Sequence, residues 1–419
     1  MKLIKKALLL TGIISAMIDV AYAQKPAEPS SDYALKQVVV LTRHGLRAPL
    51  VAGAQQLIDA TPYQWQAWDT DGGILTTKGG ALEVFMGGYF NQWVVQNNLL
   101  PKNTCPTEAD YHVYTNVILR TIATAQFFTA GAFPGCDNIK INHFSDLASR
   151  DPIFYPAVKE NSPAFQAKVT KEIHDYIAKQ DLGASYAKLE QIIDYKNSVA
   201  CKVQKQCDLS QVPNVPDLTP DQEPLVNGGI RIGFLIVDAF MLQDYEGFPS
   251  HQVAWGNIKS AADWQSIAKI RNAYIDATFL QPAIVKNIIQ PMLKRLDTLM
   301  PAKMTQAQPK VTLLSGHDTT VGPVITALGV NEYQLPGQYE KTPIGGEVVF
   351  QRWYDKKHDR DLLKVEYVYQ STEQLRNLSP LSLKTPPQRV TLSFKGCDID
   401  TNGFCPWQDF RKVIYNALH

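Results

Sequence analysis

Three short apolar runs along the chain are rich in β-branched residues, and each is followed by a polar turn and a segment with helical spacing. The runs cover 38–42, 111–116 and 310–316, and the helical segments cover 76–96, 118–131 and 320–328. Continuous apolar runs of this length are typical of strands that are buried on both faces. Strand, turn and helix repeated in this order predict an α/β fold with a mostly parallel sheet flanked by helices.

Two further patterns divide the chain. Near the C-terminus the runs 348–355, 362–370 and 389–394 alternate more strictly, which predicts hairpins or edge strands. Between about 145 and 280, the segments 162–180, 185–199 and 262–279 have the spacing of amphipathic helices. We therefore expect an α/β catalytic domain at 24–144 plus 281–419, interrupted by a mainly α-helical cap domain at 145–280.

Residues 1–23 have the three parts of a secretory signal peptide. MKLIKK is basic, ALLLTGIISAMI is apolar, and AYA is a cleavage site of small residues. A retained membrane anchor is the alternative, but the apolar stretch is short for a bilayer span. We expect export to the periplasm, cleavage of the signal peptide, and no membrane attachment of the mature chain.

The charge of the chain is close to neutral. The formal net charge is +1, and residues 1–23 hold three lysines and one aspartate, so their removal leaves −1. This balance argues against a nucleic-acid-binding function. Nothing in the sequence indicates an oligomeric state.

Six cysteines are present, and they show no CxxC or Cys/His spacing of a zinc site. In an oxidising compartment such a set predicts disulfides. Many pairings are open, and we favour neighbours in sequence because each such pair closes a short loop. The expected disulfides are Cys105–Cys136, Cys201–Cys207 and Cys397–Cys405.

The most informative motif is R-H-G-x-R-x-P, which begins at Arg43 directly after a buried run. Arg43 and Arg47 offer planar forks of donors, which suit an oxyanion such as phosphate. Two neighbouring cations also lower the proton affinity of His44, and a neutral imidazole is a nucleophile. The motif therefore predicts covalent catalysis through a phosphohistidine. A solvated turn is the alternative, which the position after a buried strand disfavours.

A second motif, SGHDTT, follows the run at 310–316 and should lie at the same carboxyl edge of the sheet. His317 can donate to a phosphoryl oxygen, and Asp318 can protonate the departing alcohol if its pKa is raised or the medium is acidic. Alone, this motif fits a turn or a helix cap equally well. Arg120 follows the remaining strand-like run and is a further candidate, with an exposed helix arginine as the alternative.

Motifs of other enzyme classes are absent from the sequence. It contains no GxxxxGK[ST], no GxGxxG after a strand, no HExxH and no GxSxG. Nucleotide, zinc and serine-hydrolase chemistry therefore lack support, and we expect neither a metal nor a cofactor.

These residues resemble the histidine acid phosphatases, the secreted branch of a superfamily that includes the phosphoglycerate mutases. The likeness covers the RHGLRAP start, the inner arginine, the HD motif and the late cysteines. It implies a phosphoglycerate-mutase-like fold, phosphorylation of the motif histidine and proton donation by Asp318. It also implies the phosphate-binding set, which is Arg43, Arg47, Arg120 and His317.

Long stretches outside the motifs, among them LTTKGGALEVFMGGY and LQDYEGFPSHQVAWG, are similar to the bacterial periplasmic glucose-1-phosphatases. This likeness implies that Glu246 lines the pocket near the sugar, where it accepts hydrogen bonds and repels additional phosphates. A surface glutamate is the alternative. That subgroup has Asn after the nucleophilic histidine, whereas this chain has Gly45, as phytases and general acid phosphatases do.

We therefore expect a metal-independent acid phosphomonoesterase whose partner is a small-molecule sugar phosphate, glucose 1-phosphate. The nearest alternative is a phytase acting on inositol hexakisphosphate, or a broad acid phosphatase. A phosphotransferase or mutase fits less well, because its bisphosphorylated primer should be scarce outside the cytoplasm. A non-catalytic phospho-ligand receptor is disfavoured because both His44 and Asp318 are present.

Overall fold

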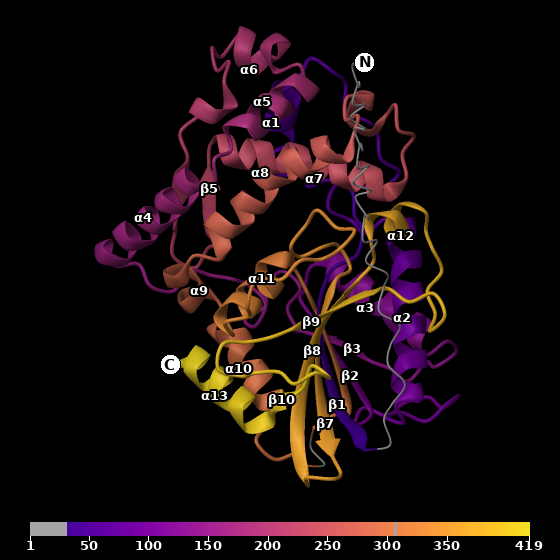
Figure 1. Cartoon of the computed structure of the whole chain (residues 1–419). Coiled ribbons are helices and arrows are strands. Elements are labelled where there is room, and N and C mark those ends of the chain that lie inside the picture. The colour runs from indigo at the N-terminus through magenta and orange to yellow at the C-terminus, as the bar shows by residue number, and fades with distance from the viewer. Residues whose placement is uncertain (1–31, 306–307) are drawn as a thin grey trace, which may run out of the picture.

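The computed structural model describes residues 32–305 and 308–419, and the predicted signal peptide at 1–23 lies outside them. Within the described residues, helices flank a sheet, and a further group of helices lies above it (Figure 1). The strands are β1 (Tyr33–Arg43), β2 (Tyr111–Thr115), β3 (Ile141–His143), β4 (Val215–Asp217), β5 (Leu225–Asn227), β6 (Val311–Gly316), β7 (Glu347–Asp355), β8 (Arg360–Tyr369), β9 (Gln388–Leu392) and β10 (Cys405–Pro406). The helices are α1 (Ala54–Asp59), α2 (Thr77–Gln96), α3 (Leu119–Ala132), α4 (Pro163–Lys179), α5 (Gly183–Ile192), α6 (Val199–Lys202), α7 (Gly229–Glu246), α8 (Ala261–Phe279), α9 (Pro282–Ile288), α10 (Gln290–Leu299), α11 (Asp318–Ala327), α12 (Thr372–Arg376) and α13 (Trp407–Leu418).

The sheet has a parallel centre and an antiparallel edge. Strand β6 lies between β1 and β2 and runs parallel to both, and β3 continues the parallel part beyond β2. On the other side of β1, the strands β7, β8 and β9 follow as antiparallel neighbours. The α/β fold and the C-terminal hairpins predicted from the apolar pattern are therefore confirmed.

Strand β1 is buried on both faces, as its continuous apolar run predicts. Val38 and Val40 pack in a core with residues of α2 and α3, and Val39 and Leu41 pack in a second core on the opposite face. All four are 0% exposed. Helices α10, α11 and α13 cover this second face (Figure 1). Successive side chains along a strand point to opposite faces, so β1 packs against the helices on both sides of the sheet.

The glycines of α2 allow it to lie close to α3. A Cβ atom at Gly87 would be 1.9 Å from the carbonyl oxygen of Phe128, and one at Gly131 would be 2.1 Å from that of Val84. Neither position has room for a side chain, so these glycines form the helix contact. The side chain of Thr76 caps α2 by accepting from the backbone N–H of Gly79.

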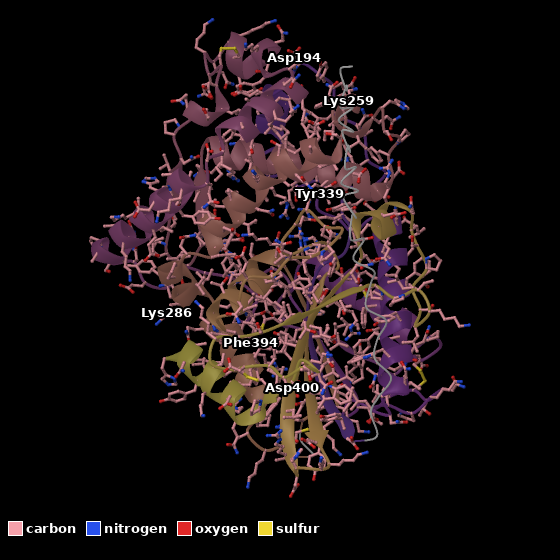
Figure 2. All side chains as sticks on the ribbon, in the orientation of Figure 1. Asp194, Lys259, Lys286, Tyr339, Phe394 and Asp400 are labelled. Atoms are coloured by element: carbon pink, nitrogen blue, oxygen red, sulfur yellow. A yellow bond between two sulfur atoms is a disulfide. The ribbon has the colours of Figure 1, made fainter. Side chains whose placement is uncertain are left out.

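Helices α4, α5, α7 and α8 lie together above the carboxyl edge of the parallel strands (Figure 1). We propose that this group is the cap domain. Tyr339, from the chain after α11, lies between the group and the sheet (Figure 2). Its ring stacks on Trp264 with centroids 5.8 Å apart, and its carbonyl accepts from Asn272 Nδ2 at 2.8 Å. These contacts tie α8 to the C-terminal part of the chain.

The structure contains the three disulfides that the short loops predict. They are Cys105–Cys136, Cys201–Cys207 and Cys397–Cys405. Across 32–305 and 308–419, no helix has the length and apolar character needed to cross a membrane.

Candidate active site

The histidine of the RHG motif lies in a loop whose backbone is fixed on both sides. The N–H of His44 donates to the carbonyl of Gly316 at 2.9 Å, and its carbonyl accepts from the N–H of Gly345 at 3.1 Å. The N–H of Gly45 donates to Thr124 Oγ1 at 2.9 Å. Four separate segments of the chain therefore meet at this loop, which follows from the parallel pairing of β1 with β6.

The hydrogen bond of the His44 ring defines which nitrogen can react. Nδ1 lies 2.9 Å from the carbonyl oxygen of Gly45. Because a carbonyl oxygen only accepts, Nδ1 carries the proton and Nε2 keeps its lone pair. Burial and the positive charges of Arg120 and Arg43 hold the pKa of His44 well below its usual range. The lowered pKa favours the neutral imidazole of His44, with Nε2 available as a nucleophile.

His317 has the opposite tautomer. Its Nδ1 lies 3.3 Å from Nη2 of Arg120, and a guanidinium only donates. Nδ1 is therefore the acceptor, and Nε2 carries the proton. Burial and Arg120 hold the pKa of His317 well below its usual range. The two imidazoles face each other edge to face with centroids 5.4 Å apart, one offering a lone pair and the other an N–H.

Three arginines predicted to bind phosphate converge on the same place. Arg47 and Arg120 line a cavity together with both histidines, and Arg43 is 1% exposed beside Asp318. The Nε atoms of all three are buried without a hydrogen-bond partner among the described residues. The guanidinium groups of Arg47 and Arg120 at the cavity suit an oxyanion, because each offers several N–H donors in a fixed fork.

Asp318 is an ionised carboxylate in this arrangement. Its Oδ2 lies 3.2 Å from Nη2 of Arg43 and 3.3 Å from Nη2 of Arg271. Burial alone would raise its pKa, but Arg43 and Arg271 lower the pKa to about 2. The raised pKa that would make Asp318 a proton donor by itself is therefore not found. The group must receive a proton before it can give one.

The cavity has a volume of about 390 Å³ and lies at the carboxyl edge of β1, β2 and β6. The first turns of α3 and α11 border it, and the N-terminus of a helix favours an anion. Residues of α7 and α8 close it from above, among them Phe234 and Tyr274. The geometry therefore combines an anion site at the bottom with an apolar wall contributed by the helical group.

Glu246 is not among the residues that line this cavity. Its Oε2 accepts from Thr76 Oγ1 at 2.8 Å, in the last turn of α7. Leu235, on the same helix, lines the cavity, and eleven further residues place Glu246 about 16 Å along the axis. Glu223, in the turn before β5, does line the cavity, where its charge interacts with that of Arg120. No pattern in the sequence around it indicates this role.

A buried charge network beneath the cavity was also missed. Asp238 accepts from Arg47, and Arg271 contacts both Asp238 and Glu340. Each of these side chains is less than 10% exposed. A signal for Asp238 was present, because it interrupts the strongly apolar helical segment FLIVDAFML. Charged residues in such segments are rarely buried unless they are paired.

The side chain of Glu83 in α2 leaves no room for a side chain at position 45, which is Gly45. A Cβ atom at position 45 would lie 2.5 Å from Oε1 of Glu83, and one at Gly345 would lie 2.8 Å from the same atom. Glu83 is 2% exposed and is held between the two glycines. Burial raises its pKa to about 8, so the carboxyl group is neutral at acidic pH. A side chain at position 45 would have to displace a group that has no free space.

Replacement of Gly45 by Ala is expected to lower kcat by about 10²-fold, because a shift of about 1 Å in a nucleophile has an effect of this order. Overpacking should also lower the free energy of unfolding by about 1–3 kcal/mol. Glu83→Ala in the same chain should restore part of both losses, measured by steady-state kinetics and denaturant unfolding. Gly183→Ala is the control, since no atom lies within 4 Å of its Cβ position. Additive losses in the double variant would contradict the contact.

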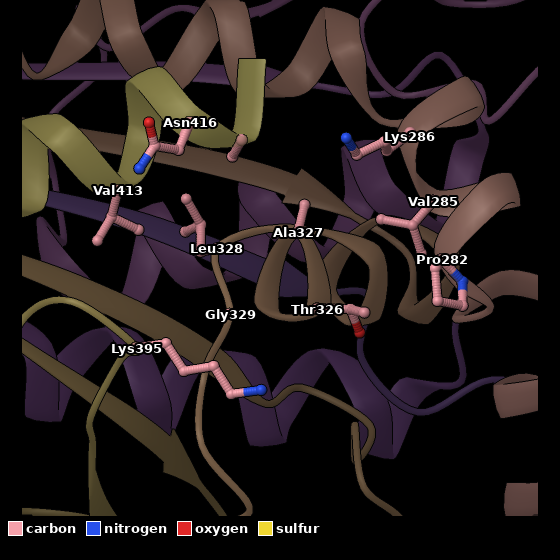
Figure 3. Close-up of a pocket in the computed structure, with 11 residues that line it drawn as sticks. Pro282, Val285, Lys286, Thr326, Ala327, Leu328, Gly329, Lys395, Val413 and Asn416 are labelled. Atoms are coloured by element: carbon pink, nitrogen blue, oxygen red, sulfur yellow. The ribbon is translucent and has the colours of Figure 1, made fainter. Parts of the chain in front are cut away.

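A second cavity, of about 340 Å³, lies between α9, α11 and α13 (Figure 3). Its walls are mostly apolar, with Lys286 and Lys395 at its edge. No histidine, arginine or acidic side chain of the described residues lines it. Among residues 32–305 and 308–419, no cluster of side chains fits a metal ion. The nucleophile, the phosphate donors and the acidic group are therefore all found at the first cavity.

Comparison with known proteins agrees with this geometry. Residues 34–370 match the histidine phosphatase superfamily (branch 2). The chain is 45% identical to a glucose-1-phosphatase of Salmonella typhimurium over 413 residues, which cover 99% of each chain. It is 30% identical to phytase AppA of Escherichia coli over 430 residues, which cover 98% of each.

Solved structures show the same relationship. The apo form of Hafnia alvei phytase superposes with a TM-score of 0.86 at 31% identity, covering 93% of this chain and 98% of that one. Both the sequence and the fold are therefore shared over almost the whole length. The chain is a hydrolase that belongs to branch 2 of the histidine phosphatase superfamily.

Proposed function

We propose that this protein hydrolyses a sugar phosphate, glucose 1-phosphate, through a phosphohistidine on His44. The observation that carries the proposal is the meeting of the His44 imidazole, whose Nε2 keeps its lone pair, with the guanidinium groups of Arg47 and Arg120 at one cavity. Identity of 45% to a glucose-1-phosphatase supports the choice of substrate.

In the first step, Nε2 of His44 attacks phosphorus and the bond between phosphorus and the sugar oxygen breaks. The arginines and the N–H of His317 hold the phosphoryl oxygens and neutralise their charge. The proton on Asp318 moves to the departing sugar oxygen, so glucose leaves as a neutral alcohol. The product is a phosphohistidine and a carboxylate at position 318.

The proton for this step enters with the substrate. At acidic pH a phosphomonoester is mainly a monoanion, since its second pKa is about 6. Asp318 is a carboxylate at the same pH, because its pKa is about 2. Once the substrate is bound, the arginines favour its dianion, and the proton passes from the phosphoryl group to Asp318. Above about pH 6 the substrate arrives without this proton. This is the behaviour of an acid phosphatase.

In the second step, water replaces the sugar. The carboxylate of Asp318 takes a proton from the water, whose oxygen attacks phosphorus, and the bond to Nε2 breaks. His44 regains its lone pair and inorganic phosphate leaves. No metal or cofactor is needed for either step.

Selection of the substrate is assigned to Glu223, beside the phosphate-binding groups. Burial and the charge of Asp318 raise its pKa to about 7, against the effect of Arg120. Below this pH the neutral carboxyl can exchange hydrogen bonds with a sugar hydroxyl. Above it, the carboxylate repels additional phosphates on a substrate.

The proposal is tested by kcat/KM for glucose 1-phosphate and inositol hexakisphosphate at about pH 5 and about pH 8. We expect the native chain to prefer glucose 1-phosphate by about tenfold or more, with a larger preference at the higher pH because Glu223 is then ionised. Glu223→Gln should remove this pH dependence, and Glu332→Gln, an exposed control, should keep it. Preferential hydrolysis of the inositol substrate by the native chain would overturn the assignment.

A phytase is the second candidate. The solved structures that superpose on this chain at 29–31% identity are phytases. In the sequence, Gly45 is the feature that favours a phytase. The close contact of Gly45 with Glu83 offers a different reason for the glycine. The same substrate comparison decides between the two functions.

We also propose that the protein acts in the periplasm on a small-molecule phosphomonoester. The basic and apolar segments of residues 1–23 support export. Three disulfides suit an oxidising compartment.

A further inference from the structure

Arg271, in the middle of α8, contacts three carboxylates with one guanidinium. Its Nη2 lies 3.3 Å from Asp318 Oδ2 and 2.5 Å from Glu340 Oε1, and its Nε lies 3.5 Å from Asp238 Oδ1. The side chain is 1% exposed. It comes from the helical group, whereas Asp318 is the first residue of α11 and directly follows the β6 motif, so Arg271 is a charged link from α8 to the catalytic motif.

The other arginines use the same carboxylates. Arg43 pairs with Glu340 at 2.7 Å and with Asp318, and Arg47 pairs with Asp238 at 3.1 Å. Three arginines thus balance three carboxylates in a closed network. Arg120 forms no ion pair with a carboxylate of the described residues, so it adds one uncompensated positive charge.

Several groups face Asp318 from the surrounding elements. They are Arg43 from β1, Arg47 from the loop after β1, Arg120 from α3, Arg271 from α8, His317 at the start of α11, Glu223 before β5, and Glu340. Both active-site histidines are neutral, and the Glu223 carboxyl is neutral below about pH 7. The charge balance at acidic pH therefore depends on the arginines, Asp238, Glu340 and Asp318 itself.

We propose that Arg271 is a positioning residue that holds Asp318 as an aimed carboxylate until substrate binds, so that the transferred proton enters with the substrate. The inference rests on the proposed function. A substrate monoanion matches the single positive charge of Arg120, and its internal proton then moves to Asp318. Without Arg271 the network lacks one positive charge, and a buried Asp318 takes its own proton from solvent.

The proposal predicts how many protons accompany the binding of a dianion. Sulfate is the probe, because it resembles phosphate and keeps two charges over the acidic range. In the native chain, two negative charges exceed the one uncompensated positive charge, so Asp318 must take up a proton as sulfate binds. In Arg271→Gln, Asp318 already carries that proton before sulfate binds, so this group has no further proton to take up.

Sulfate binding to the full chain is measured by titration calorimetry between about pH 4 and about pH 6. The dissociation constant of the native chain should rise about tenfold per pH unit, because one proton binds with each sulfate. For Arg271→Gln the change should be less than about threefold over the lower unit of this range. Arg271→Lys keeps the charge and should recover the native slope. Arg360→Gln, at an exposed ion pair in the C-terminal hairpin, is the matched control and should also keep it.

The readout is the change in the sulfate dissociation constant per pH unit, rather than the affinity at one pH. A merely structural role would weaken binding equally at every pH. A native slope in Arg271→Gln overturns the proposal. If that variant does not fold, Asp318→Asn decides: it should lose the proton uptake, and retention of the native slope would assign the proton to another group and overturn the proposal. Sulfate binding needs no turnover. Failure of the native chain to hydrolyse glucose 1-phosphate would therefore refute the proposed function and leave this test intact.

Discussion

Replacing His44 by Ala should lower kcat on the order of 10⁴-fold or more for every phosphomonoester, because the nucleophile that forms the covalent intermediate is lost. The phosphate cradle stays, since the guanidinium of Arg47 donates to Asp238 and that of Arg120 donates to His317. The affinity for inorganic phosphate should therefore change much less than the rate. Steady-state kinetics and calorimetric phosphate binding measure the two effects separately.

The control for this variant is His251→Ala, which replaces an exposed histidine in the segment after α7. It should behave like the native chain in both measurements. Normal turnover of His44→Ala with several substrates would contradict a nucleophilic role and would leave the cavity as a binding site.

Asp318→Asn should produce a loss that depends on the leaving group. For glucose 1-phosphate, whose alkoxide is a poor leaving group, kcat/KM should fall by about 10²–10⁴-fold, the usual contribution of a general acid. For p-nitrophenyl phosphate, which releases a stable phenolate, the loss in kcat/KM should be about tenfold or less. The amide keeps the size of the side chain but cannot supply the proton, and kcat/KM isolates the step in which the alcohol leaves.

Asp175→Asn, on the exposed surface of α4 beside Lys171, is the control and should leave both substrates unaffected. Equal losses for the two leaving groups in Asp318→Asn would show that the residue supports the site without donating a proton.

The fold could be predicted because the local pattern and the tertiary environment agree. The β-branched run at 38–42 is a strand buried on both faces, and the RHG loop follows it at the carboxyl edge of the sheet. The HD motif follows β6, which pairs directly with β1. Two motifs about 270 residues apart were expected together because the carboxyl ends of neighbouring parallel strands share one edge.

The rest of the site depends on packing that no local pattern encodes. Glu246 is the last residue of the apolar helix α7, and only the length and direction of α7 show that it lies away from the cavity. Glu223 enters from a loop without periodicity. Arg271 contacts both Asp318 and Glu340 only because α8, the start of α11 and the chain after α11 come together. The charges around Asp318 then set its protonation state. The motif alone could not predict that state.

The central claim is a covalent phosphate on His44, and rapid quenching tests it most directly. The native chain is mixed with phosphorus-labelled glucose 1-phosphate, quenched in alkali within milliseconds, digested and sequenced by mass spectrometry. Phosphohistidine is stable in alkali and labile in acid. We predict an alkali-stable label on the peptide that contains His44, formed and lost at rates no slower than kcat. An unlabelled His44 during steady turnover, or a label on another residue, would contradict the mechanism.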